Sequence, residues 1–127
     1  MEHVYYSDGN KKKISWTIES NNTRTDQVRT HIEDYYEKIS TEQSKYVALH
    51  VGIFWSVGRF IIKNGDTVNI MLDLKSMFDH LAENKMTSDP FVNSRVGFIQ
   101  QLIDQRKLVI KYQITEPSSN KASALLL

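Results

Sequence analysis

The order in which two kinds of hydrophobic periodicity follow one another constrains the fold of this chain most. Apolar residues alternate with polar ones in "HVYYSDG" and in "KISWTIES", as is typical of half-buried β-strands. The Asp-Gly that ends the first run favours a turn, so we expect these two runs to form a β-hairpin. After the turn signal "SNNTRTD", the stretch "QVRTHIEDYYEKI" has Val28, Thr30 and Ile32 in alternation, which predicts a third antiparallel strand.

A long helix is expected next, in "STEQSKYVALHVGIFWSVGRF", where Ser40 or Thr41 can cap its first turn. Apolar residues recur there at helical spacing: Tyr46, Leu49, Ile53, Val57 and Phe60. Four more apolar residues widen this stripe until it covers nearly the whole circumference of the helix: Val47, Val51, Phe54 and Trp55. A helix that is apolar on nearly every side is typically buried, so we expect it to lie at the centre of the core.

The remaining elements are a strand in "TVNIMLD", a helix in "LKSMFDHLAEN", a helix in "VNSRVGFIQQLIDQ" and a strand in "KLVIKYQITEP". The order is thus β-β-β-α-β-α-α-β, with "SSNKASALLL" starting a short last helix. A strand, a helix and a parallel strand in succession normally form a right-handed crossover. We therefore expect an α/β fold with a five-stranded mixed sheet, helices on both faces, and the fourth strand beside the first. The length of 127 residues favours one domain, residues 1–127.

Composition excludes several kinds of site. The chain has no cysteine, which excludes disulfides, a thiolate zinc site and a cysteine nucleophile. The formal net charge of +1 argues neither for nor against nucleic acid as a partner. No apolar run approaches the roughly eighteen residues of a membrane span, so we expect no membrane partner. We expect a cytoplasmic location. The sequence leaves the oligomeric state open.

Four short segments resemble ribonuclease H in their order and separation. "YYSDG" resembles the first strand of that family with its aspartate and glycine. "SKYVALHVGIFWSV" resembles its first helix, and "IMLDLKSMF" its fourth strand with a second aspartate. The tail "SSNKASALL" is similar to its closing segment, in which an asparagine precedes Ala-Asp and a leucine-rich helix. This resemblance covers nearly the whole chain and implies a ribonuclease H-like fold.

The resemblance also implies a catalytic site, which this sequence does not fully carry. Family members cleave the RNA strand of RNA–DNA hybrids with two divalent metals, magnesium or manganese, held by four clustered carboxylates. Asp8 and Asp73 match the first and third of these acids. Lys45 and Ser123 occupy the positions of the other two. The resemblance therefore implies a degenerate, non-catalytic domain without a cofactor, which binds nucleic acid (an RNA–DNA hybrid or a duplex) or a protein partner.

The sequence leaves two alternatives open. Glu42 lies one helical turn before Lys45, and it could join Asp8 and Asp73 in a metal-dependent ribonuclease. Lys45 is expected to place its ammonium near both aspartates, where a fixed cation would replace a metal. If Lys45 instead points to solvent, the two aspartates are only turn and cap residues.

Five basic residues are candidates for contacts with a nucleic-acid backbone: Lys11, Lys12, Lys13, Arg24 and Arg29. The lysines form a run at the predicted hairpin turn, and the arginines follow near the next bend. Such a cluster can contact phosphates, although a charge run at a turn is more often simply solvated.

Overall fold

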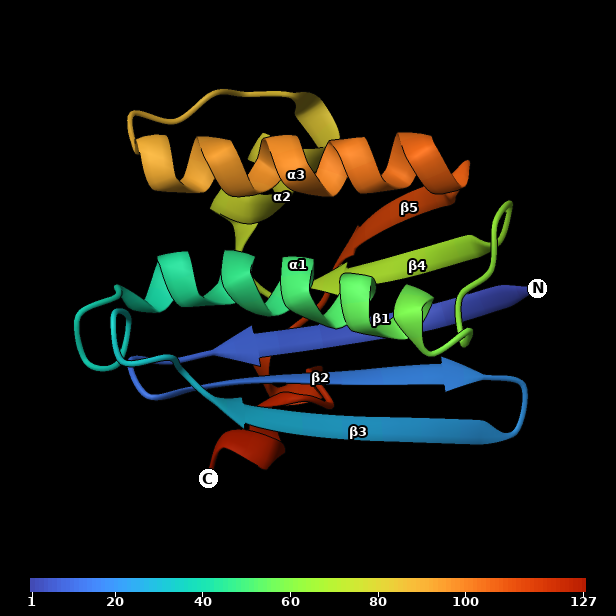
Figure 1. Ribbon diagram of the computed structural model, residues 1–127, viewed down its shortest axis with the longest axis horizontal. Coiled ribbons are helices and arrows are strands. Elements are labelled where there is room, and N and C mark those ends of the chain that lie inside the picture. Colours follow the sequence, from blue (N-terminus) through green and yellow to red (C-terminus); the bar gives the residue numbers. More distant parts are fainter.

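The computed structural model describes residues 1–127 and contains a single five-stranded sheet with the strand order β3-β2-β1-β4-β5 (Figure 1). The strands are β1 (Glu2–Gly9), β2 (Lys13–Ser20), β3 (Thr23–Thr30), β4 (Thr67–Leu72) and β5 (Val109–Ile114). β2 is antiparallel to both β1 and β3, whereas β4 is parallel to β1 and β5. The mixed sheet and the place of the fourth strand beside the first are therefore confirmed.

The third strand differs from its predicted bounds. The turn before β3 takes only Asn21 and Asn22, and Asn21 has the left-handed φ of 55° that such a tight turn requires. The segment expected to be a longer turn is therefore already strand, and Thr23 pairs with Ser20. β3 lies at the edge of the sheet and is largely exposed, so its polar residues need no apolar alternation to form a strand.

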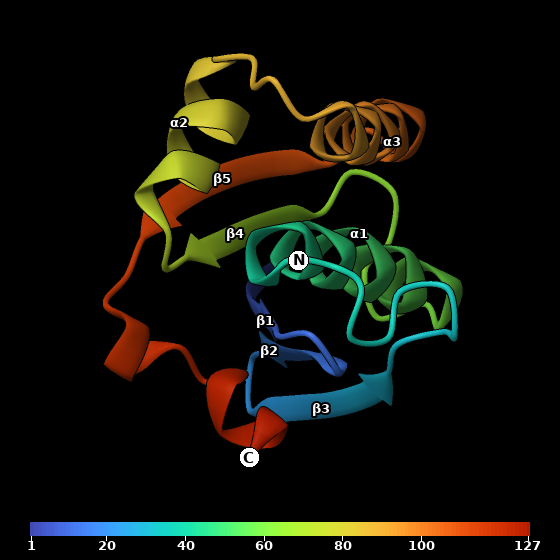
Figure 2. The ribbon, with the colours of Figure 1, turned by 90° about the vertical axis from the view of Figure 1, so that its left-hand side faces the viewer.

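Three α-helices accompany the sheet: α1 (Thr41–Gly58), α2 (Lys75–Glu83) and α3 (Pro90–Arg106). Ser40 caps α1 as expected, because its hydroxyl accepts a hydrogen bond from the Gln43 N–H while the Gln43 side chain accepts one from the Ser40 N–H. α1 packs against β1 and β2, with α3 beside it (Figure 2). The tail forms two short 3₁₀ helices, Pro117–Ser119 and Ser123–Leu126.

The two faces of the sheet are covered by different elements. Trp16 on β2 points toward α1. Gly52 lets α1 approach the sheet this closely, because a Cβ at this position would overlap the Tyr5 hydroxyl and lie 2.8 Å from the Trp16 ring. Ser15 points to the opposite face, since strand residues alternate, and its hydroxyl donates to the Ala122 carbonyl at 2.8 Å. The C-terminal segment therefore covers the face that α1 does not (Figure 2).

Burial of α1 is less complete than its sequence predicts. Leu49 and Ile53 are fully buried, but the Phe54 side chain is 64% exposed and Trp55 is half-buried. The sheet and α3 cover only part of the surface of α1. Because its apolar stripe is wider than this covered part, some apolar side chains remain exposed. None of the helices combines the length and the apolar composition needed to cross a lipid bilayer.

Candidate functional site

The fold brings Asp8 and Asp73 to the same edge of the sheet. β1 and β4 are parallel neighbours, Asp8 is the next-to-last residue of β1, and Asp73 directly follows β4. The arrows of both strands point to the left in Figure 1. Asp73 is not a helix cap, because Leu74 occupies the N-cap position of α2. The carboxylates are largely withdrawn from solvent, with side-chain exposures of 13% for Asp8 and 8% for Asp73.

Lys45 on α1 places its ammonium between the two carboxylates. The Nζ atom lies 2.7 Å from Asp8 Oδ1 and 3.2 Å from Asp73 Oδ1. The same Asp8 oxygen also accepts a hydrogen bond of 2.8 Å from the Gly9 N–H. Lys45 is only 17% exposed, so the expected ion pair is confirmed and the solvent-facing alternative is wrong.

Gly9 explains how α1 comes close enough for this contact. A Cβ on Gly9 would overlap the Ser44 hydroxyl and lie 2.7 Å from the Ser44 backbone, so only glycine allows β1 to touch the helix at this point. His31 holds the same turn of α1, because its Nε2 lies 2.7 Å from the Ser44 hydroxyl and 3.1 Å from the Asn10 carbonyl. Lys45 follows Ser44 directly and is thus held at the strand ends.

The C-terminal segment supplies two neutral donors to the same carboxylates. Ser123 donates to Asp8 Oδ2 at 2.6 Å. Asn120, which is nearly buried, donates to Asp73 Oδ2 and to the Ser7 carbonyl, each at 2.9 Å. The sequence predicted the place of Ser123 but assigned no role to Asn120. The asparagine of the tail resemblance was the signal that could have identified it.

Every oxygen of the two carboxylates therefore has a protein donor. Burial lowers the pKa of Lys45, but hydrogen bonding and attraction from Asp8 and then Asp73 raise it by more, so the pKa lies above its ordinary value. Lys45 is consequently charged at neutral pH. The three charged side chains of this cluster carry a net charge of −1, and the neutral donors complete its hydrogen bonding.

The residues present do not fit a divalent metal. Magnesium and manganese need several oxygen ligands, whereas here a fixed ammonium holds one oxygen of each carboxylate. No group of three or more acidic, histidine or cysteine side chains in the chain is arranged to hold a metal ion. Glu42 does not supply the third acid that the alternative requires. It lies a full helical turn before Lys45, and its carboxylate accepts a hydrogen bond of 3.2 Å from Ser76 on α2.

The five basic residues do not form one surface. Lys11 and Lys12 lie in the exposed turn after β1, at the same sheet edge as the carboxylates, and Lys12 pairs with Glu37 at 3.5 Å. Lys13 begins β2 and pairs with Thr30 in the sheet, next to Arg29. Arg24 lies at the other end of β3, where it forms an ion pair of 3.0 Å with Asp26. Arg24 and Arg29 are five positions apart, an odd spacing along a strand, so they also project from opposite faces of the sheet. The grouping of Arg24 with the others was wrong.

No model of a known protein family matches the sequence, and no curated protein matches it significantly. Solved structures do match the fold. Ribonuclease H1 of the halophilic archaeon Halobacterium salinarum is 15% identical, with a TM-score of 0.75 over 98% of this chain and 94% of that chain. The N-terminal RNase H domain of a Mycobacterium tuberculosis protein is 14% identical, with a TM-score of 0.71 over 98% of this chain and 89% of its own.

A third similar structure is LC11-RNase H1 in complex with an RNA/DNA hybrid. It is 12% identical, with a TM-score of 0.71 over 97% of this chain and 92% of that chain. At identities this low, the structural matches establish a shared architecture but not a shared activity. The strand order, the helices and the full-length structural matches agree, and this chain has a ribonuclease H-like fold.

Proposed function

We propose that this domain binds nucleic acid without cleaving it. The observation that carries the proposal is the Lys45 ammonium, which forms hydrogen bonds to both Asp8 and Asp73 where a two-metal nuclease needs ligand oxygens free for its ions. Catalysis of that kind depends on metals that activate water and stabilise the leaving oxygen. A cluster that is closed by its own lysine offers neither.

Charge supports a nucleic-acid partner. A phosphate backbone is repelled by a bare carboxylate pair, and Lys45 lowers the negative charge of this pair without a metal. The exposed Lys11 and Lys12 lie in the turn at the same edge of the sheet and can neutralise phosphates there. Among the similar structures, LC11-RNase H1 was solved with an RNA/DNA hybrid, and a foamy viral protease-reverse transcriptase (14% identical, TM-score 0.56) with double-stranded DNA.

Fluorescence anisotropy tests the binding. A labelled RNA/DNA hybrid and a DNA duplex of the same sequence are titrated with the protein in EDTA at several salt concentrations. We expect binding without divalent metal, weakening linearly on a logarithmic salt scale. The double variant Lys11→Ala/Lys12→Ala should bind more weakly and have a shallower salt slope. Arg24→Ala, at the far end of β3, is the matched control and should bind like the parent. Binding only in the presence of magnesium, or equal losses in both variants, would contradict the proposal.

The same mixtures test the metal-dependent ribonuclease alternative. After incubation with magnesium or manganese, the RNA strand of the hybrid should remain intact. Cleavage with turnover that disappears in Asp73→Asn would establish a nuclease and overturn the non-cleaving assignment.

A further inference from the structure

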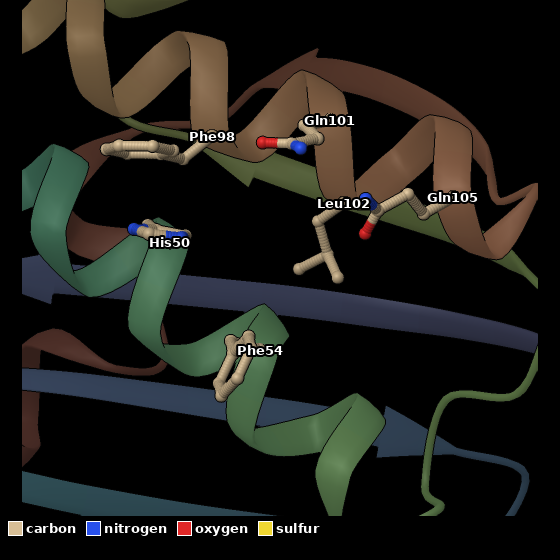
Figure 3. A pocket seen from close by; sticks show the side chains of 6 residues that line it. All are labelled: His50, Phe54, Phe98, Gln101, Leu102 and Gln105. Carbon is tan, nitrogen blue, oxygen red and sulfur yellow. The ribbon is translucent and has the colours of Figure 1, made fainter.

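A groove between α1 and α3 lies on the helical side of the molecule, away from the carboxylate cluster. Its volume is about 300 Å³, and six residues line it: His50, Phe54, Phe98, Gln101, Leu102 and Gln105. Figure 3 shows His50 and Phe54 projecting from α1 and the other four from α3. Phe54 and Phe98 are 64% and 53% exposed, so large aromatic side chains remain in solvent at this groove.

At one end of the groove an aromatic contact joins α1 to α3. The His50 ring stacks on the Phe98 ring, with the centroids 5.7 Å apart and the planes at 15°. Arg95 lies 3.0 Å from His50 Nδ1 and donates to the Tyr35 hydroxyl at 2.9 Å. Arginine can only donate, so His50 Nδ1 accepts and the imidazole is neutral. Burial and then Arg95 lower the pKa of His50, in agreement with this form. This end of the groove is thus preformed, which reduces the entropy lost on binding.

The charged residues at one end of the groove are basic. No acidic residue lines it. A second hollow at the C-terminal ends of α1 and α3 is also free of acids and is lined by Lys63 and Arg106 among others. Arg59, stacked over Trp55, is exposed at that end of α1. The one acid in the later turns of α3, Asp104, bonds with Gln100, one helical turn away on a different side of the helix from the groove.

We propose that this groove binds an acidic amphipathic helix of a partner protein. Two parallel ridges of side chains on neighbouring helices accept a third helix, whose apolar residues at i, i+3 or i+4, and i+7 would fit between Phe54 and Phe98. The basic residues at the end of the groove where α1 and α3 finish would attract carboxylates on that helix. Gln101 and Gln105, exposed on the α3 side, provide neutral hydrogen-bonding groups at the rim. This interaction is separate from nucleic-acid binding at the strand ends.

Selection from a displayed library of randomised helical peptides tests the proposal directly, because it requires no identified partner. The immobilised protein should enrich peptides with Leu, Phe or Trp at helical spacing and with flanking Asp or Glu. Binding of a synthetic enriched peptide is then measured by anisotropy, and its position is mapped by amide chemical-shift changes in the labelled protein. We expect these changes to centre on α1 and α3.

Variants make the test specific. Phe54→Ser and Phe98→Ser alter exposed side chains, so both proteins should keep the parent melting temperature while binding the enriched peptide at least tenfold more weakly. Ile114→Ser, at an equally exposed apolar residue on β5, is the control and should bind normally. Arg59→Glu combined with Arg106→Glu should reverse the preference toward a peptide in which every Glu is replaced by Lys.

Four outcomes would overturn the proposal. Selected peptides could be basic or lack apolar spacing, or their chemical-shift changes could lie outside α1 and α3. A single-stranded oligonucleotide could occupy these helices with higher affinity than any acidic peptide. Sedimentation velocity could show a parent dimer that Phe54→Ser abolishes, which would identify a second copy of the chain as the occupant.

Discussion

Replacing Lys45 by methionine removes the ammonium while keeping most of the aliphatic stem, so the variant isolates the charge. In the parent, Nζ lies 2.7 Å from Asp8 and 3.2 Å from Asp73, and all three side chains are at most 17% exposed. In the variant, two neighbouring carboxylates lose their only cation. They keep the Gly9 N–H and the neutral donors Ser123 and Asn120.

The expected loss of stability follows from these contacts. At an effective dielectric of about 20, each attraction at this separation is about 5 kcal/mol before desolvation is subtracted. Removing one partner of a buried ion pair typically costs about 3–5 kcal/mol. Because the remaining neutral donors still stabilise the carboxylates, we expect Lys45→Met to lower the free energy of unfolding by about 3 kcal/mol. For a domain of this size that lowers the melting temperature by roughly 10 °C.

Thermal unfolding followed by circular dichroism measures the effect. Lys75→Ala, which removes an exposed lysine paired with Asp79, is the control and should leave the melting temperature nearly unchanged. The pKa of Lys45 is raised, so its contribution is complete below its ordinary value of 10.5 and is lost as pH rises through the higher folded value. The difference between parent and Lys45→Met should therefore be constant from pH 7 to 10 and shrink above it. A Lys45→Met protein that melts with the parent would refute a structural role for the ammonium.

Three further predictions concern other variants. Lys45→Glu should melt below the parent and regain stability in magnesium or manganese, by about 2.7 kcal/mol when the metal is at 100 times its Kd, whereas the parent melt should not respond. Asp66 is buried, which would raise its pKa, but hydrogen bonds from His3 and from a backbone N–H lower it to about 2, so Asp66→Asn should be less stable than the parent near pH 6. Because a depressed pKa loses its contribution on acidification, this difference should vanish as pH falls from about 4 to about 2 in acid titrations. Gly9→Ala should lose about 1–3 kcal/mol in denaturant unfolding, because its Cβ would overlap Ser44.

The carboxylate cluster could be predicted from the sequence because it depends only on the order of elements. Parallel neighbours end at one edge of the sheet, so recognising β1 and β4 was enough to bring Asp8 and Asp73 together. The position of Lys45 beside these aspartates could be predicted because the first helix packs over the same edge. Asn120 was missed because an asparagine in an irregular tail gives no periodic signal, and its two bonds depend on where that tail crosses the sheet.

The bounds of β3 and the groove could not be predicted for other reasons. The sequence of an edge strand rich in Thr, Arg and Asp resembles that of a turn. Solvent and one neighbouring strand satisfy its backbone hydrogen-bonding groups, so it needs no apolar alternation. That error also hid the opposite directions of Arg24 and Arg29. The exposure of Phe54 depends on where α3 lies against α1, and a helix that is apolar on nearly all sides gives no sign of which side stays uncovered.

The central claim is that the ammonium of Lys45 closes the site to metal ions, and manganese provides the most direct test. Mn²⁺ is paramagnetic and broadens the amide signals of residues near its binding site. In the ¹⁵N-labelled parent titrated with Mn²⁺, we predict no selective broadening at Gly9, Leu74 and Ser123, while Lys45→Glu should show it at all three. Selective broadening of these signals in the parent at submillimolar Mn²⁺ would contradict the account.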